Sequence, residues 1–198
     1  MKRGLFGGTF DPPHVGHLMM AEVARESLGL ERVDFIPTNI SPHKEGQLVQ
    51  PAAFRVRMVQ AAVKEFPHFF VSTIELAREG ISYTIDTVRE IADHSVGDDL
   101  YWLLGADMLQ DLPHWKEVEA ILSYVTIVAA PRPGVNLQAI ADDLKSLYEN
   151  ARIVILAMPE LDISSTWLRD RMQKGVRVDP LLPFGVSRLI VQERGYVL

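Results

Sequence analysis

The segment Gly7-Gly8-Thr9-Phe10-Asp11-Pro12-Pro13-His14-Val15-Gly16-His17 follows a short apolar run over residues 3–6 and precedes a helical pattern that begins near Leu18. A strand, a glycine-rich turn and a helix in this order are typical of an open parallel sheet, which binds its ligands at the carboxyl ends of its strands. Two adjacent glycines let the backbone come close to a phosphate, because they carry no Cβ atom. The segment is neither a G-x-G-x-x-G fingerprint nor a Walker A loop, since no Gly-Lys-Ser/Thr follows. We therefore expect a phosphate site of another kind at the end of the first strand.

Two histidines, His14 and His17, stand on either side of Gly16 in this segment. If Gly16 opens the helix, both rings can project from its first turn toward one anion, to which the helix start adds free N–H groups and a partial positive charge. An isolated histidine is more often a structural residue, but that role does not explain why the glycines, Thr9 and both histidines gather at one strand end. A zinc site is a weaker interpretation, because no third ligand at a suitable spacing is evident and the chain contains no cysteine.

The rest of the chain alternates short apolar runs with helical stripes. The expected strands cover residues 3–6, 33–37, 69–75, 100–105, 125–129 and 152–156, and several are almost entirely apolar, as in strands buried on both faces of a parallel sheet. The helical stripes are Val56/Val59/Val63, Ile85/Val88/Ile91, Val118/Ile121/Leu122, Leu168/Met172 and Val186/Leu189/Ile190. No segment has the character of a domain linker. The sequence predicts a single α/β domain over residues 1–198, with a doubly wound, parallel, Rossmann-like sheet and helices on both faces.

Composition excludes several classes of protein, because 47% of the 198 residues are apolar and 23% are charged, which is too apolar for a disordered chain and enough for a sizeable core. The absence of cysteine excludes thiolate nucleophiles, disulfide scaffolds and thiolate zinc sites. The formal charge, 20 − 26 = −6, argues against broad binding of DNA or RNA but not against a small phosphorylated ligand. No apolar run approaches the ~20 residues that span a bilayer, and Gly7 and Gly8 interrupt the N-terminal run too early for a signal peptide. We expect a cytoplasmic protein with neither a nucleic acid nor a membrane as its partner.

A second cluster of polar residues, Asp162-Ile163-Ser164-Ser165-Thr166, follows the last of the parallel strands expected here and precedes the Leu168/Met172 stripe. Serine and threonine are good helix N-caps, and their hydroxyls also donate to phosphate oxygens. Arg169 lies one turn into the expected helix, where its forked donors can reach the same anion. An ordinary capped helix with a solvated arginine is the alternative, and the segment alone does not decide between the two.

Together, the two segments resemble the T/HxGH nucleotidyltransferase superfamily, and the extended form of the first resembles its nicotinate mononucleotide adenylyltransferase family. The first signature is Gly-Gly-Thr-Phe-Asp-Pro-Pro-His followed by Gly-His, and the second is I-S-S-T-x-x-R. The resemblance covers the chain from Gly4 to about Arg171, and it implies that His14 and His17 act in catalysis. The residues that it implies in ATP binding at the two signatures are Gly7, Gly8, Thr9, Phe10, Ile163, Ser164, Ser165, Thr166 and Arg169.

The resemblance extends to segments that would bind the second substrate and determine its specificity. The family has a Pro-His-Lys element in the long loop over residues 38–50, and its lysine, here Lys44, contacts phosphate; Asn39 in the same loop is also expected to bind substrate. A Ser-Tyr-Thr-x-Asp-Thr element places Thr84 at a helix start, where a backbone N–H would meet the nicotinate carboxylate. The alternatives are a mobile surface lysine and a threonine that caps its helix, and the second of these is compatible with the family role.

Further expected positions follow the next two strands. Gly105 and Asp107 form a Gly-x-Asp element that the family places beside the nucleotide, although Asp107 could instead cap the next helix. Trp115 is expected to open a helix with His114 and to stack on the pyridine ring, with a core tryptophan as the alternative. Arg132 is expected to line the site, unless residues 130–134 form a plain turn.

The resemblance implies adenylyl transfer. The 5′-phosphate of nicotinate mononucleotide attacks the α-phosphorus of ATP, pyrophosphate leaves, and nicotinate adenine dinucleotide forms, as in NAD biosynthesis. A phosphate monoester is already a nucleophile, so catalysis needs alignment and charge stabilisation rather than a general base. Mg²⁺ would be the cofactor, held mainly by phosphates and water, so no metal ligands are expected from the protein. A homodimer is compatible with this function.

Three alternatives stay open from the sequence. Phosphopantetheine adenylyltransferase and glycerol-phosphate cytidylyltransferase share the first signature, but they are not expected to carry the Pro-His-Lys, Ser-Tyr-Thr and His-Trp elements together. A non-catalytic nucleotide sensor would bind ATP without turnover, and the intact His14, His17 and Arg169 argue against it. A fragment of an aminoacyl-tRNA synthetase would share His-x-Gly-His, but the length, the acidic charge and the missing Lys-rich second signature speak against it.

Overall fold

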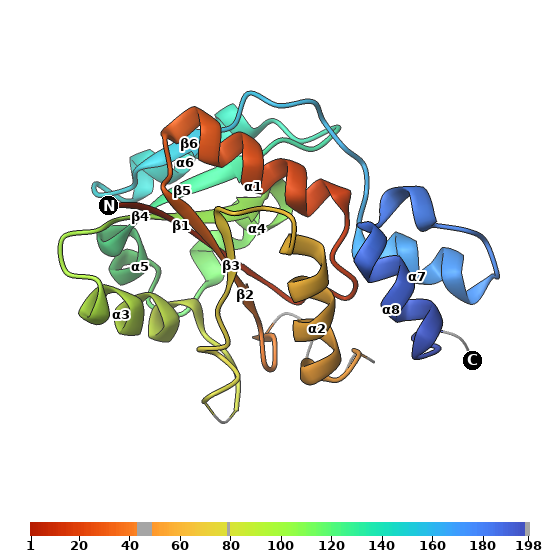
Figure 1. Ribbon diagram of the computed structural model, residues 1–198. Helices are drawn as coiled ribbons and strands as arrows, with labels where there is room; N and C mark the ends of the chain where they lie inside the picture. Colours follow the sequence, from red (N-terminus) through yellow and green to blue (C-terminus); the bar gives the residue numbers. More distant parts are fainter. Residues whose placement is uncertain (43–48, 79, 197–198) are drawn as a thin grey trace.

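The computed structural model describes residues 1–42, 49–78 and 80–196 and builds them around a six-stranded sheet (Figure 1). The strands are β1 (Lys2–Gly8), β2 (Arg32–Pro37), β3 (Phe69–Val71), β4 (Asp99–Gly105), β5 (Val125–Ala130) and β6 (Ile153–Ile155). Their order is β3-β2-β1-β4-β5-β6, and each neighbouring pair is parallel. The prediction of a doubly wound parallel sheet is confirmed.

The strand order reverses between β1 and β4, which lie side by side at the centre of the sheet. Leu5 of β1 pairs with Trp102 of β4, and Phe6 pairs with Phe35 of β2 on the other side. Connections that leave neighbouring strands in opposite directions open a crevice at the carboxyl ends of the strands. The segment that follows β1 therefore begins at this crevice.

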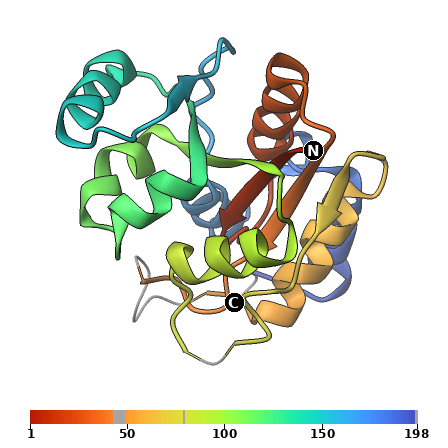
Figure 2. The ribbon, with the colours of Figure 1, turned by 90° about the vertical axis from the view of Figure 1, so that its left-hand side faces the viewer.

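The helices contribute to two hydrophobic cores. One core contains residues of α1 (Val15–Leu28), α2 (Ala52–Val63), α7 (Ser165–Gln173) and α8 (Phe184–Gln192). The other contains residues of α3 (Thr84–His94), α4 (Ala106–Asp111), α5 (Val118–Tyr124) and α6 (Leu137–Leu147). The chain also forms the 3-10 turns η2 (Leu112–His114) and η3 (Asp179–Leu181). In Figure 2 the yellow-green α3 lies in front of the sheet and the blue α7 and α8 lie behind it. Among the residues described, we find no helix with the length and apolar character needed to cross a membrane.

Neighbouring residues of the central strands contribute to different cores, because successive side chains of a strand point to opposite faces of the sheet. Leu5 and Leu104 belong to the core with α3, whereas Phe6 and Leu103 belong to the core with α1. All four are at most 5% exposed. Burial on both faces explains why these strands are nearly continuous apolar runs in the sequence.

The predicted strand over residues 69–75 is too long. β3 lies at the edge of the sheet and ends at Val71, so Glu75 is not part of a strand. The chain turns after β3, where the carbonyl of Thr73 accepts hydrogen bonds from the backbone N–H groups of Leu76 and Ala77. The alternation of apolar and polar residues continues past the strand, but the partner strand β2 pairs with only three of its residues.

The prediction that His114 and Trp115 open a helix is wrong. His114 ends the 3-10 turn η2, Trp115 follows in extended conformation, and α5 begins at Val118. The cause is Pro113, which favours a short turn here and fixes its own backbone angle.

Candidate active site

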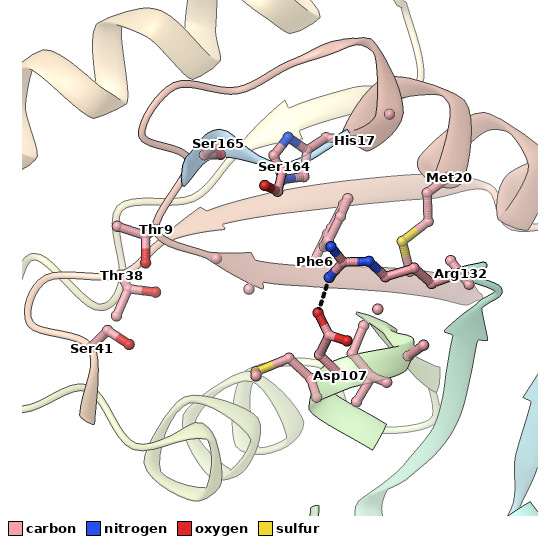
Figure 3. A pocket seen from close by; sticks show the side chains of 18 of the residues that line it. Phe6, Thr9, His17, Met20, Thr38, Ser41, Asp107, Arg132, Ser164 and Ser165 are labelled. Atoms are coloured by element: carbon pink, nitrogen blue, oxygen red, sulfur yellow. Dashed lines mark hydrogen bonds and ion pairs between the residues drawn. The ribbon is translucent and has the colours of Figure 1, made fainter. Parts of the chain in front are cut away.

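A cavity of about 410 Å³ lies at the carboxyl ends of the central strands, at the point where the strand order reverses (Figure 3). The predicted site residues that line it are Gly7, Gly8, Thr9, His14, His17, Thr84, Gly105, Asp107, Trp115, Arg132, Ile163, Ser164, Ser165 and Thr166. Figure 3 shows Thr9, Thr38 and Ser41 gathered at one end of the cavity and Asp107 facing Arg132 elsewhere along it. The structure thus brings both sequence signatures to one cavity, while the role of each residue in binding or catalysis stays a prediction.

Three predicted residues, Phe10, Asn39 and Arg169, are not among the described residues that line the cavity. Phe10 is 2% exposed, and its ring packs against that of His17 with centroids 5.1 Å apart. The side-chain amide of Asn39 donates to a backbone carbonyl at 3.2 Å. Phe10 and Asn39 therefore support the walls of the cavity from behind. Lys44, predicted to contact phosphate, lies outside the described residues.

The two histidines stack on each other at the start of α1. His14 is the N-cap, the helix begins at Val15, and the imidazole centroids of His14 and His17 are 3.7 Å apart. The backbone N–H of His14 donates to Nδ1 of His17 at 3.1 Å. Because Nδ1 accepts this hydrogen bond, a neutral His17 carries its ring proton on Nε2, which is then a donor for an anion in the cavity. Between them, Gly16 leaves room for the stacked ring, since a Cβ there would lie 3.0 Å from Nδ1 of His14 and would press against the imidazole.

The end of β1 has no room for side chains. A Cβ at Gly7 would lie 2.5 Å from Cζ2 of Trp102, which also lines the cavity, and a Cβ at Gly8 would lie 3.1 Å from the ring of Phe10. The sequence assigned these glycines to the approach of a phosphate. The structure adds a second reason for them, which is close packing against two aromatic rings.

Burial keeps His14 neutral at physiological pH. The side chain is 5% exposed, Nδ1 has no hydrogen-bond partner among the described residues, and burial lowers the pKa of the imidazole to about 4. At pH 7 His14 can therefore serve as a neutral donor or acceptor but carries no charge.

This burial predicts acid sensitivity of the fold. Below pH 6.5 an unfolded chain protonates His14, whereas the folded protein does so only near pH 4, so the free energy of unfolding falls as the pH decreases across this window. The full loss from this group is about 3 kcal/mol. Urea unfolding of the wild type and of His14→Gln at pH 7 and pH 4.5 measures it. We expect the wild type to lose about 2 kcal/mol more than the variant between these two pH values, and parallel losses in both proteins would contradict the prediction.

The second signature starts α7 beside the first. Ser164 is the N-cap, and its Oγ accepts a hydrogen bond from the backbone N–H of Trp167 at 3.2 Å, so the predicted capping role is present. The hydroxyl of Ser165 donates to the carbonyl of Pro12 at 2.8 Å. This bond joins the two signatures directly, although 153 positions separate the residues.

Arg169 holds the same junction from one turn further along α7. Its guanidinium donates to the main-chain carbonyl of Asp11 at 2.7 Å and to the hydroxyl of Thr166 at 3.3 Å. It also lies 3.8 Å from the Asp11 carboxylate. The arginine is therefore not a solvated side chain, since it links the first signature to a residue that lines the cavity.

Asp107 and Arg132 form an ion pair at the cavity (Figure 3). Arg132 also lies 3.3 Å from a carboxylate oxygen of Asp162. The N-cap of α4 is Gly105, so the alternative role of Asp107 as a cap is wrong. The segment after β5 does more than turn the chain, because it presents a guanidinium to the cavity.

The start of α3 and Trp115 form a further part of the cavity wall. Thr84 is the first residue of α3, while Tyr83 holds the cap position without a side-chain cap bond, so Thr84 does not cap the helix. Trp115 is half-buried and lines both this cavity and an adjoining one of about 70 Å³. The adjoining cavity also includes Thr84, Tyr83 and Pro42. Trp115 is therefore a wall residue rather than a fully buried core residue.

Glu75 is a cavity residue that the sequence analysis missed. It is 4% exposed, one carboxyl oxygen accepts from the hydroxyl of Thr87 at 2.8 Å, and the other has no partner among the described residues. Burial raises the pKa of this carboxyl, which favours its neutral form. Thr38 and Ser82 also line the cavity and were not predicted. Thr38 directly follows the strand predicted over residues 33–37, and that position was the available signal for it, whereas Glu75 required the true end of β3.

The fold and the cavity together define a class of proteins, namely doubly wound α/β domains that bind a nucleotide where the strand order reverses. A family model described as cytidylyltransferase-like matches residues 5–171. A probable nicotinate-nucleotide adenylyltransferase of Geobacillus thermodenitrificans is 40% identical over 194 residues, which are 98% of this chain and 85% of the relative. Its counterpart in Halalkalibacterium halodurans is 41% identical over 198 residues, 99% of this chain and 92% of the relative.

Among solved structures, the Plasmodium falciparum nicotinic acid mononucleotide adenylyltransferase in complex with NaAD has the same fold, with a TM-score of 0.80, 16% identity, and 99% and 98% of the two chains covered. The same enzyme in complex with APC gives a TM-score of 0.77 at 14% identity, with 98% and 96% covered. The chain belongs to the nicotinate-nucleotide adenylyltransferase family, within the cytidylyltransferase-like proteins.

Proposed function

We propose that this chain transfers the adenylyl group of ATP to nicotinate mononucleotide, forming nicotinate adenine dinucleotide and pyrophosphate in NAD biosynthesis. The observation that carries the proposal is the junction of the two signatures, where Ser165 bonds to Pro12 beside the cavity that His17 lines. The names of the relatives support the same reaction. So do the NaAD and APC bound to neighbouring structures, a dinucleotide product and an ATP analogue.

The ATP phosphates fit the region between α1 and α7. The start of α1 offers backbone N–H groups and the positive end of a helix dipole. His17 offers its Nε2 proton, and Ser164 and Thr166 offer hydroxyls from the start of α7. As negative charge develops on the oxygens around the α-phosphorus, these fixed donors stabilise it without having to reorganise. The attacking phosphate of nicotinate mononucleotide needs only to be held in line, so no general base is assigned.

Arg132 would change partners when ATP binds. In the structure described, its charge is balanced by Asp107 and Asp162. A polyphosphate in the cavity carries more negative charge than either carboxylate and suits a forked guanidinium. Asp107 is then left beside the nucleotide as an acceptor for hydroxyl or amino groups.

The second substrate fits the end with Thr84 and Trp115. The free N–H groups at the start of α3 can receive the nicotinate carboxylate, and the indole can stack on the pyridine ring. A charged carboxylate at Glu75 would repel the substrate acid. The raised pKa of Glu75 lessens this repulsion, because it favours the neutral form.

Mg²⁺ is proposed as the cofactor that accompanies ATP. The described residues include no group of three or more His, Asp or Glu side chains arranged to hold a metal ion. Such an ion would arrive on the triphosphate and keep most of its water, and the carboxylate of Asp107 on the cavity wall could hold one of these waters. The ion would neutralise phosphate charge during transfer. The cytoplasmic location and a homodimer stay predictions from the sequence.

Substrate selection tests the proposal. Purified protein with Mg²⁺ and ATP is offered nicotinate mononucleotide, nicotinamide mononucleotide or phosphopantetheine in turn, or CTP with glycerol phosphate. Pyrophosphate release and product mass are measured. We expect the highest kcat/KM with nicotinate mononucleotide and a product with the mass of nicotinate adenine dinucleotide. A preference for phosphopantetheine or CTP would identify a sister transferase, and ATP binding without pyrophosphate release would identify a sensor.

A further inference from the structure

The last described residue, Tyr196, is buried against the first signature. It is 8% exposed, and its hydroxyl donates to a carboxylate oxygen of Asp11 at 2.5 Å, across 185 positions of the sequence. Asp11 itself is 1% exposed. Burial and the neighbouring carboxylate raise the pKa of the phenol, so Tyr196 keeps its proton and stays a donor at any physiological pH.

The backbone around Tyr196 takes strained conformations in order to place this ring. Arg194 has φ of 50° and Tyr196 has φ of 69°, both in the left-handed region that residues with side chains rarely adopt. The residue between them is Gly195, where a Cβ would lie 2.9 Å from the ring of Phe54 in α2. Such strain persists only where the surroundings compensate for it, and the hydrogen bond from the phenol to the buried carboxylate of Asp11 is one contact that does so.

Residues of the two signatures contact each other at Asp11. Arg169 donates to its main-chain carbonyl and lies 3.8 Å from its carboxylate, and the same guanidinium donates to the hydroxyl of Thr166. Ser165 donates to the carbonyl of the next residue, Pro12. A continuous chain of polar contacts therefore runs from the phenol through Asp11 and Arg169 to Thr166 on the cavity wall.

We propose that Tyr196 is a positioning residue for ATP: its hydroxyl fixes the carboxylate of Asp11, and Asp11 in turn fixes Arg169 and the start of α7 against the first signature. Tyr196 does not line the cavity, so it acts only through these neighbours. This inference rests on the proposed function, because it takes the start of α7 as part of the ATP site. Loss of the hydroxyl would leave the carboxylate buried with one donor fewer and free to turn toward Arg169.

The test is Tyr196→Phe, which keeps the ring and removes only the hydroxyl. We expect the Kd for ATP, measured by calorimetry without a second substrate, to rise about tenfold, the size of one lost charge-assisted hydrogen bond. In steady state, kcat/KM for ATP should fall by a similar factor, while KM for nicotinate mononucleotide changes less than about twofold, since its proposed site is formed by Thr84 and Trp115 and not by the start of α7. Tyr148→Phe, at the end of α6 and outside the site, is the matched control and should behave as the wild type.

A second variant separates positioning from general loss of stability. In an Arg169→Ala background, Tyr196→Phe should change the Kd for ATP by less than about twofold, because the path to the cavity is already broken. Unchanged ATP affinity in Tyr196→Phe, an equal loss for both substrates, or a full tenfold loss in the Arg169→Ala background would each overturn the inference. The binding measurement is independent of turnover. If the wild type binds ATP but transfers nothing to nicotinate mononucleotide, the proposed function fails while the role of Tyr196 in ATP binding is still decided.

Discussion

Replacing His17 with alanine is expected to lower kcat for ATP and nicotinate mononucleotide by at least ~100-fold in a protein that still folds, the effect of losing one donor of the oxyanion type. Nδ1 of His17 accepts the backbone N–H of His14 at 3.1 Å, so a neutral ring carries its proton on Nε2, which can donate to the reacting phosphate. The ring is held in place by Phe10 and by the stacked His14, with centroids 5.1 and 3.7 Å away. Such a donor is fixed before the reaction and therefore stabilises charge in the transition state.

Pyrophosphate release measures this loss of kcat, and two further variants serve as controls. His17→Gln keeps a side-chain N–H donor near the position of Nε2 and should retain more activity than His17→Ala. His68→Ala removes an exposed histidine before β3 and should leave kcat within about twofold of the wild type, as for a surface position. Near-normal turnover in a folded His17→Ala protein would show that the histidine does not take part in the transfer.

Replacing Arg55 with methionine is expected to lower the free energy of unfolding by about 3–5 kcal/mol, the range for breaking a buried charged network. Arg55 lies in the first turn of α2 and is 2% exposed. Its guanidinium donates to three main-chain carbonyls, those of Thr9 at 2.8 Å, Gln50 at 2.9 Å and Asn39 at 3.1 Å. Methionine fills a similar volume but removes the donor from all three acceptors, which belong to half-buried residues.

Urea unfolding at pH 7 compares this variant with Arg57→Met, two residues further along the same helix. The side chain of Arg57 is 49% exposed and pairs with Glu193 on the surface, so its loss should change the free energy of unfolding by less than about 1 kcal/mol. Equal effects of the two substitutions would mean that the buried guanidinium contributes no more than a surface ion pair.

The sheet could be predicted from the sequence because its strands are buried on both faces. Each of the six expected ranges overlaps a strand, and the central ones differ from the structure by one or two residues at their ends. The largest error concerns the length of β3, which was predicted to extend to residue 75. β3 is an edge strand, so its pairing with β2, and not the local apolar pattern, decides where it ends. Helix α4 has six residues and is too short to show a period. Helix α6 was not predicted, although Leu137, Ala141 and Leu144 form its buried stripe and Asn136 caps it.

The site was predictable where a motif follows a strand directly. Gly7, His17 and Asp107 come just after strands that the sequence already predicts, and parallel strands bring such segments to one edge of the sheet. Glu75 and Tyr196 carried no such signal. The place of Glu75 depends on where an edge strand stops, and that of Tyr196 depends on a turn with left-handed backbone angles near the end of the chain.

The hydrogen bond between Asp11 and Tyr196 also affects the order in which parts of the protein fold. A contact that spans 185 positions closes a long loop, and contacts of this kind slow folding because the entropy of closure is lost before they are made. A ribosome releases Asp11 early and Tyr196 only after nearly all of the chain described here. We therefore expect the sheet to form in a nascent chain before the loop after β1 has taken its final conformation. A newly made molecule therefore orders the loop after β1 only once Tyr196 has been synthesised and can reach Asp11.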